Sequence, residues 1–509
     1  MPIQPSAKPR SPDSRLLWIA IAVAAATRFA MLGAYPLMDT TEARYAEIAR
    51  RMFESGDWVT QWIGQSVPFW GKPPLSTWMT VASFKVLGVG EFSARLPYWL
   101  CGCLLAWVVW DWLAPRSRRE AIIAIAILAG STLFYAATGT VMTDMVLALG
   151  MTLAMRGFWL ALHGEPEHRA REQCLMFLGI AIGLLAKGPI AILAGVPIGI
   201  WALRSGQVGR VFREISWGRG LISTLAVVVP WYAWAELRTP GFLEYFLVGE
   251  HWHRFQDPGW QGDLYGSAHE FPRGTIWLFA LLAVFPWSLL APVAAWKWRR
   301  AAKPATVADR SFGGYLLLWA LTPCVFFTAA GNILWTYVLP GIPAFAMASA
   351  LWLNRLPSDR SPGRWVAAGV AFTAVASVVV VSGFNMGGWD ERKSAKALIA
   401  DYESHRSDGE ALVFFRRQPL SGAFYSRGRA ELAGAADDLQ ARLAAKPAFV
   451  AVRSRHLDRV PESLSARLQP VGRHGDYHLY FGNPEAGKVQ ASRSPAIEGA
   501  RLPAVNPGG

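Results

Sequence analysis

Cysteine is scarce in this chain, which contains four cysteines among 509 residues. All four lie inside long apolar runs, so the sequence offers neither an extracellular disulfide framework nor the spacing of a zinc knuckle. We therefore interpret them as packing residues. They are Cys101, Cys103, Cys174 and Cys324.

Charge is also sparse, at 17% of residues against about 25% in ordinary soluble domains. Hydrophobic residues make up 53% of the chain, which has 25 tryptophans and a mean hydropathy of +0.24. This composition excludes ordinary soluble domains and predicts a polytopic membrane protein. Basic residues outnumber acidic ones by 50 to 36. We interpret that excess as a topology signal with some attraction to anionic lipid, and we expect no nucleic-acid partner.

The apolar runs have lengths near the roughly 17 to 25 residues that a helix needs to cross a bilayer. We therefore expect an α-helical membrane domain with about eleven transmembrane helices. The two shortest runs are the fifth and sixth. The runs lie near residues 16–36, 93–113, 120–138, 141–162, 173–186, 188–203, 219–237, 274–296, 311–330, 333–353 and 365–385.

Lysine and arginine gather before the first run and after every second run, whereas the loops at 138–141 and 330–333 contain neither. Short cytoplasmic loops hold an excess of these residues. The pattern thus predicts a cytoplasmic N-terminus, with residues 238–273 and everything after 385 outside. Lys187, between the fifth and sixth runs, is the exception. A cleavable signal peptide with small residues at 24–26 is the alternative interpretation of the first run.

The composition divides the chain into four parts. We expect a cytoplasmic tail at 1–15, a transmembrane domain at 16–385, a periplasmic α/β domain at 386–490 and a disordered tail at 491–509. In the third part, strand-like runs alternate with helix-like ones. The strand-like runs are 411–415, 448–452 and 477–481, and the clearest helix-like run is 437–446.

Residues 38–52, MDTTEARYAEIARRM, place much charge directly after the first apolar run. Apolar side chains recur at helical spacing on one face, which predicts a juxtamembrane helix on the outer surface. Asp39 and Glu42 have the spacing of a capping box, which is a purely structural interpretation of both acids. Arg44 then falls in the first turn, where the helix dipole disfavours a cation. The charged residues expected off the apolar face are Glu42, Arg44, Glu47, Arg50 and Arg51.

The segment PFWGKPPLSTW, residues 68–78, places Lys72 before two prolines. Pro74 suits the first position of a helix, so this cation also stands at a helix beginning. Two cations aimed at helix beginnings make sense if an anion binds between them, and a phosphate at the membrane surface is the natural candidate. Snorkelling of the lysine to the surface is the alternative.

Asp144 is an acid near the outer end of an otherwise apolar run, where ionisable groups usually face a cavity or a partner. A structural hydrogen bond to a neighbouring helix is the alternative interpretation. Three histidines in the loop at 250–274 are irregularly spaced and do not by themselves predict a metal site. They are His251, His253 and His269.

Several segments together resemble the bacterial branch of the GT-C-type membrane glycosyltransferases, which are related to protein O-mannosyltransferases and lipid A aminoarabinose transferases. The resemblance runs over residues 16–385 and implies a polyprenyl-phosphate sugar donor and an acceptor outside the cytoplasm. The segments, in chain order, are DTTEARYAEIARRM, GKPPLSTW, EFSARLP, TDMVL, EHWHRF and WTYVLP.

The resemblance implies a catalytic carboxylate in the first outer loop. The family's usual aspartate matches Thr41 here, so Asp39, two residues upstream, is the candidate to replace it. Glu42 matches the family's glutamate and Asp144 its second acidic position. The residues expected to be catalytic are therefore Asp39, Glu42 and Asp144.

The resemblance also implies a site for the donor phosphate, made by Arg44, Lys72, Arg254 and Tyr337. The family allows a divalent metal, but Gly71 stands where relatives carry a glutamate, so we expect no certain cofactor. Candidate contacts to substrate or metal are Tyr45 and His251.

These expectations describe an enzyme that transfers a sugar by direct, inverting displacement on the periplasmic face of the bacterial inner membrane. Its partners would be the lipid-linked donor, membrane lipids and a glycolipid, polysaccharide or protein acceptor. A flippase or transporter of lipid-linked sugars is the alternative, although acids in outer loops and the lack of evident repeats favour the enzyme. An inactive relative, lacking acids at Thr41 and Gly71, is a third interpretation. The sequence leaves the sugar and the acceptor open.

Overall fold

The chain divides into two compact units, Met1–Asp390 and Glu391–Gly509. The expected tail at 491–509, and residues 1–11 of the expected tail at 1–15, lie outside the described residues. The computed structural model describes residues 12–64, 66–257, 259–266, 269–298, 300, 304–356, 362–407 and 409–483.

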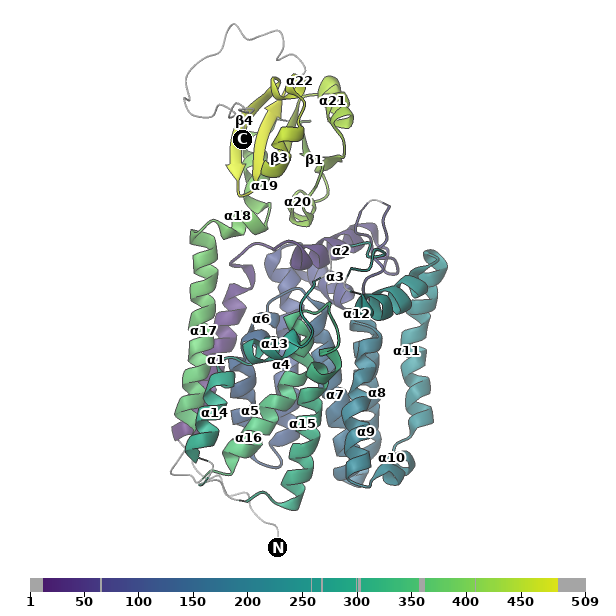
Figure 1. Cartoon of the computed structure of the whole chain (residues 1–509), viewed down its shortest axis with the longest axis vertical. Coiled ribbons are helices and arrows are strands. Elements are labelled where there is room, and N and C mark those ends of the chain that lie inside the picture. Colours follow the sequence, from purple (N-terminus) through teal and green to yellow (C-terminus); the bar gives the residue numbers. More distant parts are fainter. Residues whose placement is uncertain are drawn as a thin grey trace. The chain divides into compact units, whose positions relative to one another are not determined.

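The first unit is a bundle of helices (Figure 1), and its longest members run roughly side by side. Figure 1 also shows α2 (Thr41–Ser55) lying across one end of the bundle and α10 (Val208–Glu214) at the other. The long helices are α1 (Pro12–Ala30), α4 (Glu91–Leu113), α7 (Thr143–His163), α8 (Arg169–Ala186), α11 (Trp217–Arg238), α15 (Val307–Phe327) and α17 (Gly363–Met386). The shorter ones include α3 (Leu75–Leu87), α5 (Arg118–Gly130), α6 (Thr132–Ala137), α9 (Gly195–Arg204), α12 (Arg254–Gln256), α13 (Thr275–Ala283), α14 (Trp287–Trp298) and α16 (Ile342–Asn354).

Each of the apolar runs found in the sequence is a helix or a pair of helices, which confirms a helical membrane domain. The number of eleven spans is not confirmed. Within the described residues, six helices are long and apolar enough to cross a membrane, or seven if one bent pair counts as a span. The difference arises because several runs are broken. The run at 120–138 is interrupted at Ser131, and the helices α13 and α14 meet at a bend of 80°.

Small residues bring α7 and α8 into close contact. A Cβ atom added at Gly150 would lie 2.6 Å from the carbonyl oxygen of Gly179, and one added at Gly179 would lie 2.3 Å from that of Gly150. Helices in membranes associate through close van der Waals packing, which small residues permit, because the hydrophobic effect does not favour contact between helices in lipid. This close packing fixes α7, which carries Asp144 in its first turn.

The helix predicted at 38–52 is present as α2, but its charged residues are not all on the outside. Glu47 is fully buried and Arg50 is 1% exposed, and the two form a hydrogen-bonded ion pair at 2.7 Å. The expectation that both would lie off the buried face is therefore wrong. Their mutual charge compensation is what permits burial on this helix.

The capping box predicted at the start of α2 is also absent. The N-cap residue is Thr40, and its side chain makes no capping hydrogen bond. The Glu42 carboxylate accepts a hydrogen bond from the backbone nitrogen of Met38, at 3.3 Å.

The second unit is the small α/β domain that the composition predicted, with a five-stranded sheet in the order β2-β1-β3-β5-β4. Leu412 and Phe414 of β1 enter one core cluster and Val413 and Phe415 the other, so apolar side chains cover both faces of the sheet. The strands are β1 (Ala411–Phe415), β2 (Glu431–Ala433), β3 (Ala448–Arg453), β4 (Leu468–His474) and β5 (Tyr477–Gly482). The helices include α19 (Lys396–His405), α20 (Leu420–Tyr425), α21 (Ala436–Ala445) and α22 (Glu462–Ser465).

Replacing Gly179 with valine should destabilise the first unit by about 1–3 kcal/mol, because the new side chain meets the backbone of α7. The measurement is thermal unfolding of the purified protein in detergent. Gly199→Val is the matched control, since a Cβ atom there meets nothing within 4 Å. Equal midpoints for the two variants would contradict close packing of α7 on α8.

Candidate functional site

A cavity of about 220 Å³ lies among α7, α15 and the segments around residues 72, 187, 250 and 337. Part of its wall is apolar and comes mainly from α7 and α15. The remainder is an unusual concentration of charge for a membrane domain. The charged residues on this wall are Lys72, Asp144, Lys187, Glu250 and Arg254, and His251 and Tyr337 lie beside them.

Lys72 stands just before α3, as the sequence predicted, and Pro74 is the N-cap residue of that helix. Its ammonium nitrogen donates a hydrogen bond to the carbonyl oxygen of Gly71 at 2.5 Å. The same nitrogen lies 3.2 Å from the carboxylate of Glu250. Lys72 is thus turned into the cavity instead of snorkelling away from it.

Glu250 holds the cations of the cavity together. Its carboxylate accepts hydrogen bonds from Arg254 at 3.0 and 3.1 Å and from the Tyr245 hydroxyl at 3.4 Å, in addition to Lys72. Burial of this side chain, which is 6% exposed, would raise its pKa, but Lys72 and Arg254 outweigh that effect and the pKa lies below its ordinary value. Glu250 is therefore an anion at neutral pH.

A stretch of π-helix, Glu244–His253, presents Glu250 and places Arg254 one turn further on. Such wider turns are rare and frequently occur at functional sites. Arg254 also lies 3.5 Å from the carboxylate of Asp263, so two acids compensate its charge. Glu250 thus pairs with both Lys72 and Arg254, and Arg254 pairs in addition with Asp263.

Asp144 and Lys187 form a second ion pair on the cavity wall, at 2.5 Å, and both side chains are 11% exposed. The Lys187 ammonium also lies over the ring of Tyr337, 4.5 Å from its centroid. The hydrogen bond to a neighbouring segment that we considered for Asp144 is therefore present. The pair nevertheless borders the cavity.

Arg44 and Tyr45 lie beside this cavity and are not among the residues that line it. Arg44 donates a hydrogen bond to the carbonyl oxygen of Tyr265 at 2.6 Å. Its buried Nε atom has no partner in the described part of the chain. Burial raises the pKa of Tyr45, with Arg44 opposing and Asp144 adding to the effect. Tyr45 thus lies within electrostatic range of the cavity charges.

Glu42 points to a different partner. Its two carboxylate oxygens each accept a hydrogen bond of 2.8 Å from Arg95, which is fully buried. Arg95 also donates to the carbonyl oxygens of Leu32, Tyr35 and Pro36. These contacts make Glu42 the anchor of a buried arginine. Asp39 is half-buried and also lies outside the cavity wall.

The described residues contain no group of three His, Cys, Asp or Glu side chains placed to hold a metal ion. His251 binds the carbonyl oxygen of Phe246 through Nδ1 at 2.7 Å, and Glu250 is engaged by two cations. Burial lowers the pKa of His251 below its ordinary value and keeps the imidazole neutral, which is the form that can accept a hydrogen bond or bind a metal ion.

The structure therefore brings five of the predicted site residues to one cavity, and it leaves four beside it. The five are Lys72, Asp144, His251, Arg254 and Tyr337, and the four are Asp39, Glu42, Arg44 and Tyr45. The cavity wall carries two further charged residues, Glu250 and Lys187, that the sequence did not assign to the site. Lys187 had carried a signal, because it broke the alternation of charge across the predicted spans.

A comparison of structures defines the class of protein. The crystal structure of ArnT from Cupriavidus metallidurans in the apo state superposes with a TM-score of 0.77 and 20% identity, covering 94% of this chain and 99% of that one. The same protein bound to undecaprenyl phosphate gives a TM-score of 0.71, with 94% and 100% covered. The chain is a polytopic membrane protein with the GT-C fold and a small strand-containing domain at its C-terminal end.

Sequence comparisons then show which glycosyltransferases the chain is similar to. The dolichyl-phosphate-mannose-protein mannosyltransferase family matches residues 17–246. An undecaprenyl phosphate-alpha-4-amino-4-deoxy-L-arabinose arabinosyl transferase of Edwardsiella ictaluri is 30% identical over 339 residues, which cover 64% of this chain and 56% of the relative. Its counterpart in Yersinia pestis is 29% identical over 329 residues, covering 62% and 55%. The chain spans about half the length of the curated relatives it matches, and these findings confirm the resemblance seen in its motifs.

Replacing Glu42 with alanine should destabilise the protein by about 3–5 kcal/mol, because the buried Arg95 guanidinium would lose its carboxylate. The readout is thermal unfolding in detergent. Glu54→Ala is the matched control on the same helix, since Glu54 is 50% exposed in its ion pair and should contribute about 1 kcal/mol or less. Similar midpoints for the two variants would show that Glu42 is not an anchor.

Proposed function

We propose that this protein is a glycosyltransferase that moves a sugar from a polyprenyl-phosphate donor to a membrane glycolipid acceptor such as lipid A. The observation that carries the proposal is the cavity in which Lys72 and Arg254 meet carboxylates beside an apolar wall. The solved relative with the same fold binds undecaprenyl phosphate. The names of the curated relatives also describe a sugar carried on that lipid.

In the proposed donor complex, the phosphate takes the place of the Glu250 carboxylate between Lys72 and Arg254. These two cations already point at one anion, and hydrogen bonds between charged groups are the strongest that a protein can offer a phosphate. Tyr337 supplies an uncharged donor on the same wall. Arg44, whose buried Nε atom has no described partner, is assigned as a further cation for the phosphate.

The proposed reaction is a single displacement at the anomeric carbon. A carboxylate accepts the proton of the acceptor hydroxyl, whose oxygen forms the new bond to the anomeric carbon. The bond from that carbon to the phosphate oxygen breaks, and the lipid phosphate leaves with the electron pair. Lys72 and Arg254 stabilise the negative charge that develops on it. Inversion at the sugar follows from this geometry.

Asp144 is the carboxylate that we assign as the base, because it lines the cavity. The Lys187 ammonium fixes its position through an ion pair, with 2.5 Å between the Lys187 nitrogen and an Asp144 oxygen. Asp39 remains the second candidate. Glu42 is assigned a positioning role through Arg95. The proposed steps use no metal ion, and the described residues contain no group of three His, Cys, Asp or Glu side chains placed to hold one.

The proposed location is the bacterial inner membrane, with the N-terminus in the cytoplasm and the C-terminal domain in the periplasm. The distribution of lysine and arginine supports this orientation. It would place the cavity where a polyprenyl tail can stay in lipid while the sugar meets an acceptor at the water interface. The apolar wall contributed by α7 and α15 suits that tail.

Purified protein supplied with a radiolabelled polyprenyl-phosphate sugar and envelope glycolipids should form a new labelled glycolipid. Asp144→Asn should lower kcat by roughly 10²–10⁴, the usual contribution of a general base. Asp437→Asn, an exposed acid on α21, is the control and should keep full activity. Movement of the label across liposomes without a new glycoside would instead identify a transporter, and labelled protein or polysaccharide would correct the acceptor.

Lys72→Ala should weaken binding of undecaprenyl phosphate by roughly 10–100-fold, because a charge-assisted hydrogen bond is lost. Glu250→Gln should tighten the same binding, since the competing internal anion is removed. Titration of the detergent-solubilised protein with the lipid measures both. Lys85→Ala, an exposed lysine at the end of α3, is the control. Weaker binding by Glu250→Gln would show that this acid orders the cations and does not compete with phosphate.

A further inference from the structure

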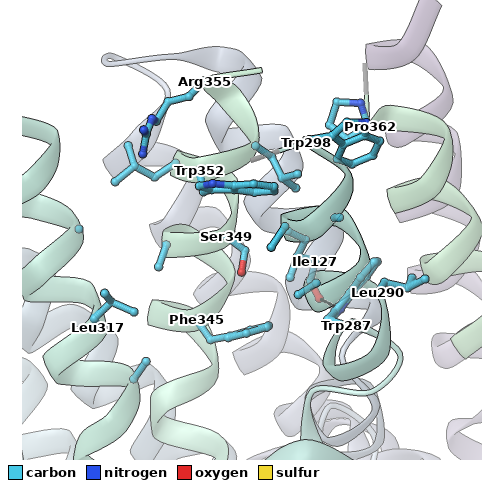
Figure 2. Close-up of a pocket in the computed structure, with 18 of the residues that line it drawn as sticks. Ile127, Trp287, Leu290, Trp298, Leu317, Phe345, Ser349, Trp352, Arg355 and Pro362 are labelled. Carbon is cyan, nitrogen blue, oxygen red and sulfur yellow. Dashed lines mark hydrogen bonds between the residues drawn. The ribbon is translucent and has the colours of Figure 1, made fainter. Parts of the chain in front are cut away.

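A second, larger cavity of about 680 Å³ lies among α14, α15, α16 and α17. Figure 2 shows Trp287 and Leu290 of α14 facing Phe345 and Ser349 of α16 across it. Its walls share no residue with those of the cavity that holds Lys72 and Asp144. It is therefore a separate site, for which the proposed transfer reaction has no use.

The fold leaves this space for two reasons. The helix α14 has only 12 residues and begins after the 80° bend that separates it from α13, so it covers part of a span. The surrounding walls also carry small residues where larger ones would fill the gap. A Cβ atom added at Gly314 would meet nothing within 4 Å, and Ala291, Ala294 and Ala348 likewise leave room.

Water is a poor occupant of the cavity. Its walls are mostly aliphatic and aromatic, and apolar cavities lacking several polar partners stay dry. The volume is in the range of pockets that hold a small molecule, about 300–1,000 Å³. Hydrocarbon from the surrounding membrane is the material that fits this surface.

One end of the cavity is different, because it carries cations. Lys297, Arg310 and Arg355 lie there, and Figure 2 shows Arg355 at the same end as Trp352 and Trp298. Lys297 and Arg310 form no ion pair with any described residue. They belong to the basic clusters that follow alternate apolar runs in the sequence.

The acid at this end does not neutralise them. Asp309 is the acidic residue on the cavity wall, and it is already paired with Arg116. The Lys297 ammonium lies over the rings of Trp298 and Trp365, at 5.9 and 5.5 Å from their centroids. Tryptophan and lysine in this arrangement are typical of the level at which lipid headgroups lie.

We propose that this cavity binds one anionic glycerophospholipid, with an acyl chain between α14 and α16 and the phosphate against Lys297 and Arg310. The apolar depth and the positive mouth complement the two halves of such a molecule. The basic loops direct the mouth toward the cytoplasmic leaflet, whose anionic lipids attract such groups. This site would anchor the short helix α14 by filling the space behind it.

The test is native mass spectrometry of the full chain in detergent, equilibrated with equal amounts of phosphatidylglycerol and phosphatidylcholine. The wild type should retain one phosphatidylglycerol. Gly314→Leu places a side chain in the cavity and should lower retention about tenfold. Gly383→Leu on α17 is the matched control, since that glycine also has open space around it but does not line the cavity. It should retain the lipid as the wild type does.

A second variant separates the headgroup from the chain. The double substitution Lys297→Gln with Arg310→Gln changes exposed residues and should lower the preference for phosphatidylglycerol about 30-fold, as two lost headgroup contacts imply. Unchanged retention by Gly314→Leu would overturn the proposal, as would equal retention of both lipids by the wild type. A dimer in place of a lipid adduct would mean that a second copy of the chain covers the cavity. None of these outcomes depends on glycosyltransferase activity.

Discussion

A charge inside a membrane domain must be compensated by an opposite charge. Each charged side chain on the cavity wall accordingly forms an ion pair. Lys72 and Arg254 belong to segments far apart in the sequence, and the carboxylate of Glu250 brings their charges to one point. Without that acid, two cations would share one cavity at a high electrostatic cost. The cavity is thus built around an anion at all times, first the protein's own and then, in the proposed reaction, the donor's phosphate.

The same requirement explains why the acids of the outer loops have different roles. Glu42 and Arg95 satisfy each other so completely that neither has a free donor or acceptor group directed at the cavity. Asp144 and Lys187 satisfy each other too, but they do so on the cavity wall, where a substrate can compete for either partner. In the proposed mechanism, position relative to the cavity, and not the type of residue, distinguishes the anchoring Glu42 from the proposed base Asp144.

The sequence predicted most of the fold because its signals were local. Apolar length located the membrane helices, and short strand-like runs located β1, β3 and β5 almost to the residue. It could not predict the breaks at Ser131 or between α13 and α14, since apolar composition does not record where a helix bends. It also missed the burial of Glu47 and Arg50, because periodicity shows which face is apolar but does not show ion pairs that allow charge inside.

For the site, the motifs identified the cations and Asp144, but single residues could not show which acid each cation meets. Glu250 stands four positions before Arg254, a spacing that predicts an ion pair on a helix, yet its contact with Lys72 spans 178 positions. Lys187 was visible only as an irregularity in the distribution of charge. Lys187 does not follow the charge pattern that sets topology, and in the structure it pairs with Asp144 on the cavity wall.

The anchoring of Arg95 also limits which parts of the molecule can move. Its guanidinium ties the carbonyl groups at residues 32, 35 and 36 to α2, and its own helix is α4. The connection between α1 and α2 is thereby bound to Arg95 through three carbonyl groups, and Glu42 binds the same guanidinium from α2. The segment after α12 is held in a different way, because Arg44 donates a hydrogen bond to the carbonyl oxygen of Tyr265 and the Tyr245 hydroxyl accepts one from the backbone nitrogen of Leu264.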